Sequence, residues 1–534
     1  MDNFWARLSA SVICAVIFCC MTYKTVGAMQ QGGYKNRTFY RWLRRGDNMF
    51  FNRLAVLSLC LGLTTAVSSV AFSFLGRTWA LLISALPFFT LLGVFFAVDL
   101  KYALKVPIKL TGRFYRLMSV YLLFTGVVCY GFIALLSFLA MKNGSQLYAI
   151  ICYLPFAVMP MLLPFILCLA NGVTRIFENA RNAKFVKRAG QVLDETQIIR
   201  VGVVGSFGKT SVKNILKSIL SERFDVVQTP ESYNTPIGIA KTVFSENFSK
   251  KQVLIAEMGA RKTGDIAELC ALVKPDYAVF TGVCEQHISS FKNIQNVFEE
   301  KSEIIKCGAR VVCAESLREQ VQESFGETAG NIVFALGECV TNLRLTATKT
   351  QFTLRLGEEE IEVQTSLLGY AGVENILLSA TLAKEMGLTA EEIARGIEKI
   401  EVVPHRLQLM QSGGVYILDD AYNSNPRGAS EALVALSRFS GRKCVITPGI
   451  VECGVLEEKI NGVLGRKIAQ ERLDLVILVG DTLVGAVKKG YLENGGECSK
   501  LVVARSLEDA KEVLSKWVAP GDAVLFLNDL PDVY

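Results

Sequence analysis

The residues IIRVGVVGSFGKTSVKNILKSIL (198–220) decide the fold of the carboxyl-terminal part of the chain. They predict a short apolar strand, a glycine turn and a helix, in that order. A loop of this kind binds anions, because free backbone N–H groups and the positive end of the helix dipole point at the same place. The sequence therefore predicts a phosphate loop, whose nucleotide-binding residues are Gly205, Ser206, Gly208, Lys209, Thr210 and Ser211.

The residue types in this loop suit ATP and Mg²⁺. Gly205 and Gly208 permit a tight turn. Lys209 can reach the terminal phosphates, and the Thr210 hydroxyl can hold the metal. The spacing departs from the common eight-residue motif, since Val203 stands at its first glycine position. The alternative is a structural glycine turn with a surface lysine, but the position between a strand and a helix favours the phosphate loop.

Charge divides the 534 residues into two parts. Residues 1–190 contain 20 Lys and Arg against 4 Asp and Glu, whereas residues 191–534 contain 37 against 46. Because the basic excess lies in a part with long apolar runs, a nucleic-acid-binding protein is disfavoured. A hydrophobic fraction of 51% and a mean hydropathy of +0.34 exclude a disordered chain and a wholly soluble one. We expect a transmembrane region at 1–190 and domains at 191–403 and 404–534.

Five apolar stretches are long enough, at about 20 residues each, to cross a hydrocarbon core of roughly 30 Å. The predicted spans are Leu8–Tyr23, Phe51–Leu75, Trp79–Leu100, Tyr115–Met141 and Leu147–Asn171. The first lacks the positive segment and the cleavage site of a signal peptide, so we expect it to remain as an anchor. The spans contain almost no ionisable residue, which disfavours a transporter.

Basic residues near the span ends predict the topology, because such residues stay on the cytoplasmic side. Six Lys and Arg lie in 24–50 and five lie in 101–116. We therefore expect the amino terminus outside and the carboxyl-terminal domains in the cytoplasm. Aromatic residues interleave with arginines at 39–45, which predicts a short helix at the membrane interface. This helix can serve as a topology anchor or as a site for lipid headgroups.

Two further apolar runs, LIAEMGA (254–260) and YAVFTGV (277–283), predict strands of the same sheet. In an open parallel sheet, the carboxyl ends of the strands line the ligand crevice. Glu257 ends the first strand and His287 follows the second. We expect these two side chains to form a second Mg²⁺ position, although a lone histidine is more often a structural residue.

Seven motifs occur in the order and at the spacing of the Mur ligases: GSFGKTS, YNTPIG, AEMGA, EQHISSF, EEKSEI, PHR and DDAYNSNP. Over about residues 198–534 the chain resembles this family, and it is most similar to the members that add D-alanyl-D-alanine. The resemblance implies a P-loop ATPase-like central domain and a smaller Rossmann-like carboxyl-terminal domain. Five apolar runs within 414–528 alternate with helical patterns, which independently predicts a parallel sheet with helices on its faces.

The resemblance also implies roles for single residues. Lys209 and Thr210 would serve ATP and the first Mg²⁺, and Glu257 and His287 would serve the second. Lys301 matches a lysine that this family carbamylates, and a carbamate supplies anionic oxygen ligands suited to Mg²⁺. Without the motif, Lys301 reads as a solvated lysine in a charged helix. The other matched residues are Asn375 near the adenine, Arg406 at the interdomain hinge, and Asp420, Asn423 and Asn425 in the loop that closes over ATP. The implied catalytic residues are Lys209, Lys301, His287 and Arg406.

Three features depart from the family pattern. The chain reads Gly-Tyr-Ala-Gly-Val-Glu-Asn at 369–375, where the family usually has a His-Asn pair before the asparagine. The usual Pro-Gly-Arg is replaced by Pro404-His405-Arg406. The family's amino-terminal domain, which grips a uridine-diphosphate sugar, is missing, and the membrane spans stand in its place.

The resemblance, together with the membrane spans, implies an ATP-dependent amide ligase in the bacterial cytoplasmic (inner) membrane that acts in cell-envelope synthesis through an acyl phosphate. The expected acceptor is a muramyl peptide, and the expected amine donor is an amino acid or a dipeptide such as D-alanyl-D-alanine. One alternative is the same chemistry on a lipid-linked envelope intermediate. Another is a nucleotide-binding scaffold of an envelope-synthesis complex without catalysis.

Overall fold

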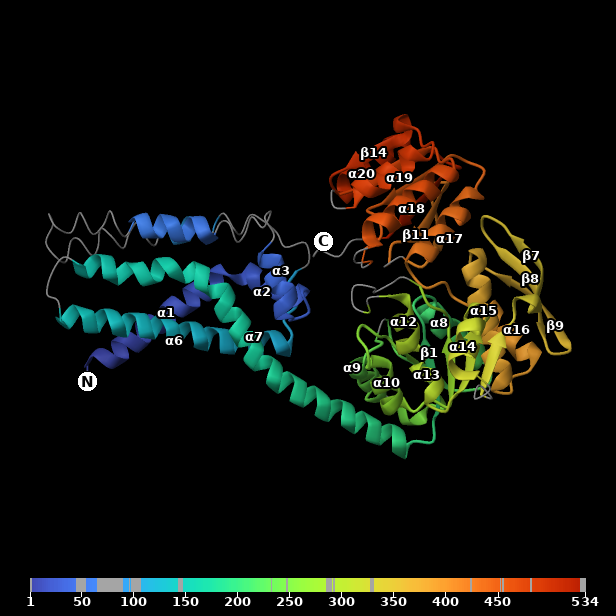
Figure 1. Ribbon diagram of the computed structural model, residues 1–534, viewed down its shortest axis with the longest axis horizontal. Helices are drawn as coiled ribbons and strands as arrows, with labels where there is room; N and C mark the ends of the chain where they lie inside the picture. The colour runs from blue at the N-terminus through green and yellow to red at the C-terminus, as the bar shows by residue number, and fades with distance from the viewer. Residues whose placement is uncertain are drawn as a thin grey trace. The chain divides into compact units, whose positions relative to one another are not determined.

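The computed structural model describes residues 2–44, 54–64, 90–95, 97, 107–142, 147–231, 233–245, 248–284, 291, 293–326, 331–422, 425–451, 453, 456–480 and 483–528. They form two compact units, which divide between Asn182 and Ala183. The amino-terminal unit is helical, and the second unit contains three β-sheets (Figure 1).

The amino-terminal unit is built from long apolar helices. Its helices are α1 (Asp2–Met21), α2 (Tyr23–Gln31), α3 (Asn36–Leu43), a short apolar helix at Leu54–Thr64, α6 (Gly112–Lys142) and α7 (Leu147–Glu195). Among the described residues, three segments are long and apolar enough to cross a membrane: Phe4–Met21, Gly112–Leu135 and Ala157–Glu195. They correspond to the first, fourth and fifth predicted spans. The second and third predicted spans lie largely outside the described residues.

Polar contacts tie the loop end of this unit together. The predicted short helix around Phe39 is confirmed as α3. Asn171 of α7 donates to the Tyr34 carbonyl at 2.9 Å, which holds the turn before α3 against α7. Glu178 is 5% exposed and accepts hydrogen bonds from Arg116 and Arg181. A buried carboxylate needs such cationic partners, because its charge is poorly solvated inside the protein.

The second unit begins with a six-stranded parallel sheet in the order β2-β3-β1-β4-β5-β6. Its strands are β1 (Ile199–Val204), β2 (Val226–Gln228), β3 (Val253–Glu257), β4 (Tyr277–Phe280), β5 (Arg310–Ala314) and β6 (Ile332–Ala335). Strand β1 lies between β3 and β4, where the strand order reverses. In open parallel sheets, ligands bind outside the carboxyl ends of the strands at such a switch point.

Helices connect and cover the strands of this sheet (Figure 1). They are α8 (Lys209–Leu220), α9 (Pro236–Val243), α10 (Asp265–Val273), α12 (Ile294–Lys301), α13 (Glu303–Lys306), α14 (Arg318–Phe325), α15 (Gly369–Glu385) and α16 (Ala390–Glu398). Ala189 and Leu193 of α7 are fully buried in the same core. The last turns of α7 therefore belong to the folded body of the second unit.

A three-stranded antiparallel sheet, which the sequence analysis did not predict, packs beside these helices. It contains β7 (Val340–Leu345), β8 (Thr350–Leu356) and β9 (Glu359–Thr365). Phe352 and Leu354 of β8 point into the core of the central domain, while Gln351 and Arg355 are exposed. Except at Thr353, which is also buried, this alternation is the pattern of a strand with one buried face.

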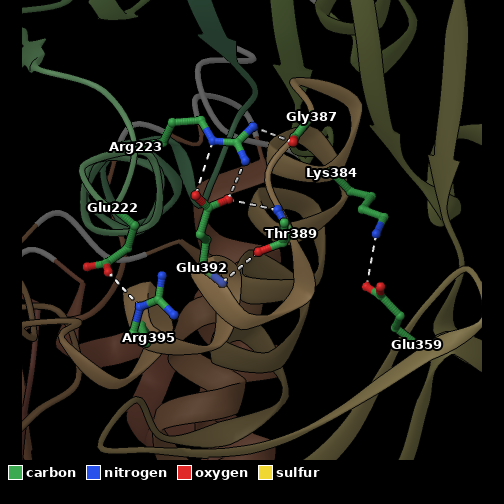
Figure 2. A network of polar contacts seen from close by, with 8 residues as sticks. All are labelled: Glu222, Arg223, Glu359, Lys384, Gly387, Thr389, Glu392 and Arg395. Atoms are coloured by element: carbon green, nitrogen blue, oxygen red, sulfur yellow. Dashed lines mark hydrogen bonds and ion pairs between the residues drawn. The ribbon is translucent and has the colours of Figure 1, made fainter.

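A network of polar contacts fixes α16 against the end of α8 (Figure 2). Arg223 forms two contacts with the Glu392 carboxylate, at 3.1 and 2.8 Å. The same carboxylate caps α16 by accepting from the backbone of Thr389 at 2.8 Å. Arg395 pairs with Glu222 at 3.2 Å. A two-point arginine–carboxylate contact is geometrically selective, so this network sets the position of α16.

The carboxyl-terminal part forms a second six-stranded sheet in the order β10-β11-β15-β12-β13-β14. The strands are β10 (Gln408–Ser412), β11 (Val415–Asp420), β12 (Lys443–Thr447), β13 (Leu475–Val479), β14 (Leu501–Ala504) and β15 (Ala523–Leu527), and the helices are α17 (Pro426–Ser437), α18 (Glu457–Gln470), α19 (Val484–Glu493) and α20 (Leu507–Trp517). The five predicted parallel strands are confirmed as β11–β15. Strand β10 adds an antiparallel edge that was not predicted.

Candidate active site

The phosphate loop has a backbone that only glycine permits. Gly205 and Gly208 have φ angles of +156° and +72°. A Cβ atom on Gly205 would lie 1.9 Å from Thr281 Oγ1, and one on Gly208 would lie 2.7 Å from Asn375 Oδ1. The loop packs closely between the end of β4 and helix α15. A surface turn with an exposed lysine, which was the alternative interpretation, would not require such close packing. Asn375 thus lies against the phosphate loop itself.

Lys209 begins α8 and lies at the mouth of the loop. Its ammonium donates to the carbonyls of Gly205 at 2.8 Å and Ser206 at 3.4 Å. Burial lowers the pKa of Lys209, and the Glu257 carboxylate acts in the opposite direction. Ser206 Oγ is buried without a hydrogen-bond partner among the described residues. An orphaned hydroxyl beside a glycine cradle and a lysine fits a phosphate, which would accept from all three.

Glu257 ends β3 and points into the same region. Its register partner in β1 is Val203, so the carboxylate lies beside the start of the phosphate loop. It accepts from Thr210 Oγ1 at 3.0 Å and from Asn234 Nδ2 at 3.2 Å. The structure thus places Thr210, predicted for the first Mg²⁺, within hydrogen-bond distance of Glu257, predicted for the second. Its proposed partner His287 lies outside the described residues.

Lys213 does not line the cavity, but it contacts Glu257 of the site and was not predicted from the sequence. Its ammonium lies 3.1 Å from Glu257 Oε2, and both side chains are almost fully buried, with 1% and 2% exposed. It occupies the apolar face of α8 with Val212, Leu216 and other buried residues. The sequence does contain a signal for this residue, since Lys213 falls within the apolar stripe of the helix. A lysine in that position is expected to be buried, and a buried cation needs an anionic partner.

Lys301, the last residue of α12, is 2% exposed and reaches the phosphate loop from the other side. It donates to the Gly205 carbonyl at 3.0 Å. Burial lowers the pKa of Lys301 to about 7, and the charge of Lys209 acts in the same direction. The reading of Lys301 as a solvated lysine is wrong. The lowered pKa increases the share of the neutral amine, which is the form that reacts with CO₂, so the residue fits a carbamate.

Residues of the carboxyl-terminal sheet complete the site. Arg406 stacks on the Tyr422 ring at 4.6 Å, and burial lowers the pKa of Arg406 against the opposing effect of Asp420. Asp420 accepts from the Leu407 backbone at 3.1 Å. Asn425 caps α17 through two backbone N–H groups, so this residue has a local structural function besides lining the cavity. Asn423, also predicted for the ATP loop, lies outside the described residues.

These elements surround a cavity of about 300 Å³. Its lining includes Ser206, Gly208, Lys209, Thr210, Ser211, Asn234, Thr235, Glu257, Arg261, Lys301, Arg406, Tyr422 and Asn425. Among the described residues, no group of three or more His, Cys, Asp and Glu side chains can hold a metal. A Mg²⁺ ion here would take Thr210, Glu257 and a carbamylated Lys301, together with phosphate oxygens. This oxygen donor set suits Mg²⁺, which usually keeps few protein ligands.

The hinge residue His405 is in a conformation that favours glycine. Its φ angle is +61°, and its Nδ1 lies 2.7 Å from Asp419 Oδ2. The side chain is 58% exposed, so the contact with Asp419 contributes little to stability. The left-handed backbone explains why glycine is usual at this position of the tripeptide.

Two substitutions separate the backbone strain at His405 from the contact with Asp419. His405→Ala and His405→Gly both remove the contact, but only glycine relieves the left-handed strain. We expect the alanine variant to have a free energy of unfolding about 1 kcal/mol lower than the glycine variant. Denaturant unfolding of the two proteins measures this difference. An alanine variant as stable as the glycine variant would show that the backbone at 405 is unstrained.

Comparisons with known proteins agree with this geometry. The sequence profile of the Mur ligase middle domain matches residues 203–383, and that of the Mur ligase glutamate ligase domain matches residues 405–528. The chain is 27% identical over 338 residues to UDP-N-acetylmuramoyl-tripeptide–D-alanyl-D-alanine ligase of Buchnera aphidicola, which covers 60% of this chain and 72% of that protein. The protein of the same name from Escherichia coli is 26% identical over 294 residues, covering 52% and 64%.

A comparison with solved structures also finds a Mur ligase. The MurF ligase of Thermotoga maritima, crystallised with ADP, superposes with a TM-score of 0.59 at 25% sequence identity. The match covers 66% of this chain and 81% of that one. Together the two matched domains account for more than half of the 534 residues. The chain therefore belongs to the Mur ligase family of ATP-dependent peptide ligases, with ATP and Mg²⁺ as its cofactors.

Proposed function

We propose that this protein is a membrane-anchored ligase that adds D-alanyl-D-alanine to a muramyl peptide in peptidoglycan precursor synthesis. The observation that carries the proposal is the convergence of Lys209, Glu257 and Lys301 on the loop at Gly205. Relatives named for this reaction match 60% and 52% of this chain, which supports the choice of substrates.

In this proposal the protein's own groups act by binding and charge. The loop amides and Lys209 hold the transferring phosphate and offset its negative charge. Thr210, Glu257 and carbamylated Lys301 would hold Mg²⁺, which supplies further neutralisation of phosphate charge. The acceptor carboxylate takes the terminal phosphoryl group of ATP to form an acyl phosphate, and ADP leaves. The donor amine then attacks the acyl carbon, loses a proton and displaces phosphate through a tetrahedral intermediate. The reaction needs no protein nucleophile.

The helical unit supports anchoring in the membrane. Three described helices are long and apolar enough to span it, and the basic residues gather in the segments predicted to be cytoplasmic. This topology places the ligase unit in the cytoplasm, where ATP is available. A reporter fused behind residue 190 should be active inside the cell, and activity only outside would overturn the topology.

We further propose that the acceptor is presented at the membrane surface. The sequence places membrane spans where related enzymes carry a sugar-nucleotide domain, and α7 runs without interruption from its apolar segment into the ligase unit. Arginines such as Arg41 and Arg44 attract anionic headgroups at this surface. A lipid-linked muramyl peptide is therefore the alternative substrate, favoured by the membrane spans.

Removal of the helical unit tests this point. The fragment should begin at Ala183 rather than after residue 190, because Ala189 and Leu193 are buried in the core of the second unit. We expect this fragment to hydrolyse or bind ATP but to ligate a soluble acceptor at least tenfold more slowly than the full-length protein in detergent. Equal rates would show that the helical unit contributes nothing to acceptor use.

The substrates themselves are tested with the detergent-solubilised full-length protein. D-alanyl-D-alanine is supplied with either UDP-N-acetylmuramoyl-tripeptide or its lipid-linked counterpart, and both phosphate release and peptide product are measured. Product formation from either acceptor supports the ligase and identifies the substrate form. ATP binding without phosphate release under any of these conditions would favour the scaffold instead.

A further inference from the structure

The buried side chain of Lys213 joins two parts of the proposed Mg²⁺ site. It lies one turn after Lys209 on α8, and its ammonium is 3.1 Å from Glu257 Oε2. The same carboxylate oxygen accepts from Thr210 at 3.0 Å. Lys213 also donates to the carbonyl of Glu231, in the segment before Asn234.

This segment, described at residues 229–231, 233 and 234 and called the 229–234 segment below, is tied to Glu257 at several points. The Glu257 amide donates to Thr229 Oγ1 at 3.0 Å, and Asn234 donates to Glu257 Oε1 at 3.2 Å. Gly259, just after Glu257, donates to the Asn234 carbonyl at 2.9 Å. The Glu231 backbone has a φ angle of +41°, a conformation that a glutamate rarely adopts. The contact with Lys213 therefore holds a strained turn at Glu231, three residues before the cavity-lining Asn234.

Lys213 is not itself in the cavity. Asn234, Glu257 and Thr210 line it, whereas Lys213 lies behind them at 1% exposure. A buried ion pair is a weak source of stability, because desolvation of the two charges offsets their attraction. Such a pair is better suited to fixing the orientation of its members. The effect of Lys213 on a ligand must then pass through Glu257 and the 229–234 segment.

We propose that Lys213 is a positioning residue that orients the Glu257 carboxylate and the 229–234 segment for Mg²⁺-dependent nucleotide binding. The inference rests on the proposed function, since it takes Glu257 as a Mg²⁺ ligand. Without Lys213, one oxygen of Glu257 loses its cationic partner and the turn at Glu231 loses its anchor. The carboxylate then meets the metal in the wrong arrangement, and more Mg²⁺ is needed to bind the nucleotide.

The test measures binding rather than turnover. The full-length protein in detergent is titrated with Mg²⁺ in the presence of a fluorescent, non-hydrolysable ATP analogue. We expect Lys213→Met to raise the Mg²⁺ concentration at half-maximal binding by at least tenfold. Lys217→Met is the matched control, because Lys217 is an exposed lysine one turn further along α8. Its Mg²⁺ requirement should stay within twofold of the parent.

A double-mutant cycle with Glu257→Gln distinguishes positioning from a general structural effect. If Lys213 acts through Glu257, then Lys213→Met should change the Mg²⁺ requirement less than twofold in the Glu257→Gln background. The double variant removes both charges of the Lys213–Glu257 pair, whereas Lys213→Met alone leaves the Glu257 carboxylate without this partner. The double variant can therefore fold even where Lys213→Met alone does not. If Lys213→Met does not fold, Lys213→Arg replaces it as the single variant, because arginine keeps a cation at this position. We expect Lys213→Arg to raise the Mg²⁺ concentration at half-maximal binding by more than twofold but less than tenfold.

Three results overturn the inference. The first is a Lys213 single variant whose Mg²⁺ requirement is within twofold of the parent. The others are an equal rise in the Mg²⁺ requirement in the parent and Glu257→Gln backgrounds, and an equal rise in Lys217→Met. A parent protein that binds no nucleotide at any Mg²⁺ concentration would instead contradict the proposed function. The two failures are therefore distinguishable in one set of titrations.

Discussion

Replacement of Lys209 with alanine is expected to lower ATP-dependent phosphate release by about 10³-fold, equivalent to about 4 kcal/mol of transition-state stabilisation. The Lys209 ammonium is held over the phosphate loop by the Gly205 and Ser206 carbonyls. A cation fixed in a partly buried site offsets developing phosphate charge more strongly than one in water. Phosphate release by the full-length protein with acceptor and donor present measures the loss.

Lys217→Ala is the control for this experiment. It removes an exposed lysine from the same helix, so a general effect of lysine removal on α8 would appear in both variants. Phosphate release by Lys209→Ala at the parent rate would contradict the catalytic role of the loop. A comparable loss in Lys217→Ala would assign the effect to the stability of α8.

Lys301→Ala is expected to lower activity by about 10²-fold and to respond to added small carboxylates such as formate or acetate. The side chain is buried beside Gly205, so its removal leaves a space lined by the loop. A carboxylate entering this space would restore the anionic oxygen ligands that a carbamate supplies. Phosphate release is measured across a series of carboxylate and Mg²⁺ concentrations.

The matched control is Lys306→Ala, which removes an exposed lysine from the neighbouring helix α13. It should behave as the parent does, with or without added carboxylate. Full activity of Lys301→Ala would exclude the carbamate but leave the ligase assignment intact. A loss that neither carboxylate nor Mg²⁺ reverses would give Lys301 a purely structural role.

The pKa of Lys301 also gives the sign of a pH dependence. Burial lowers this pKa to about 7, and only the neutral amine attacks CO₂, forming an N–C bond and releasing a proton. The neutral fraction grows as pH rises through this value. At the same concentration of dissolved CO₂, protein freed of CO₂ should therefore be reactivated faster at about pH 8 than at about pH 6. Lys301→Ala, which cannot form the carbamate, should show no such reactivation.

Much of the fold was readable from the sequence because its signals are local. The strand, glycine loop and helix at 198–220 follow one another along the chain, and the structure confirms the strand as β1 and the helix as α8. The alternating strands and helices after residue 414 are likewise short-range patterns. The small antiparallel sheet β7–β9 was missed, since its pairing depends on contacts with a core that the sequence does not display.

The amino-acid sequence by itself determined the phosphate loop, the apolar helices and the set of chemistry-bearing residues. Only the tertiary structure decided which of these residues meet. Thr210 and Glu257 are 47 positions apart and Gly205 and Lys301 are 96 apart, yet their polar atoms lie about 3 Å from each other. The sheet order brings them together, because neighbouring parallel strands end at one edge. Burial, which separates Lys213 and Lys301 from the exposed lysines beside them, is likewise a property of the packed fold.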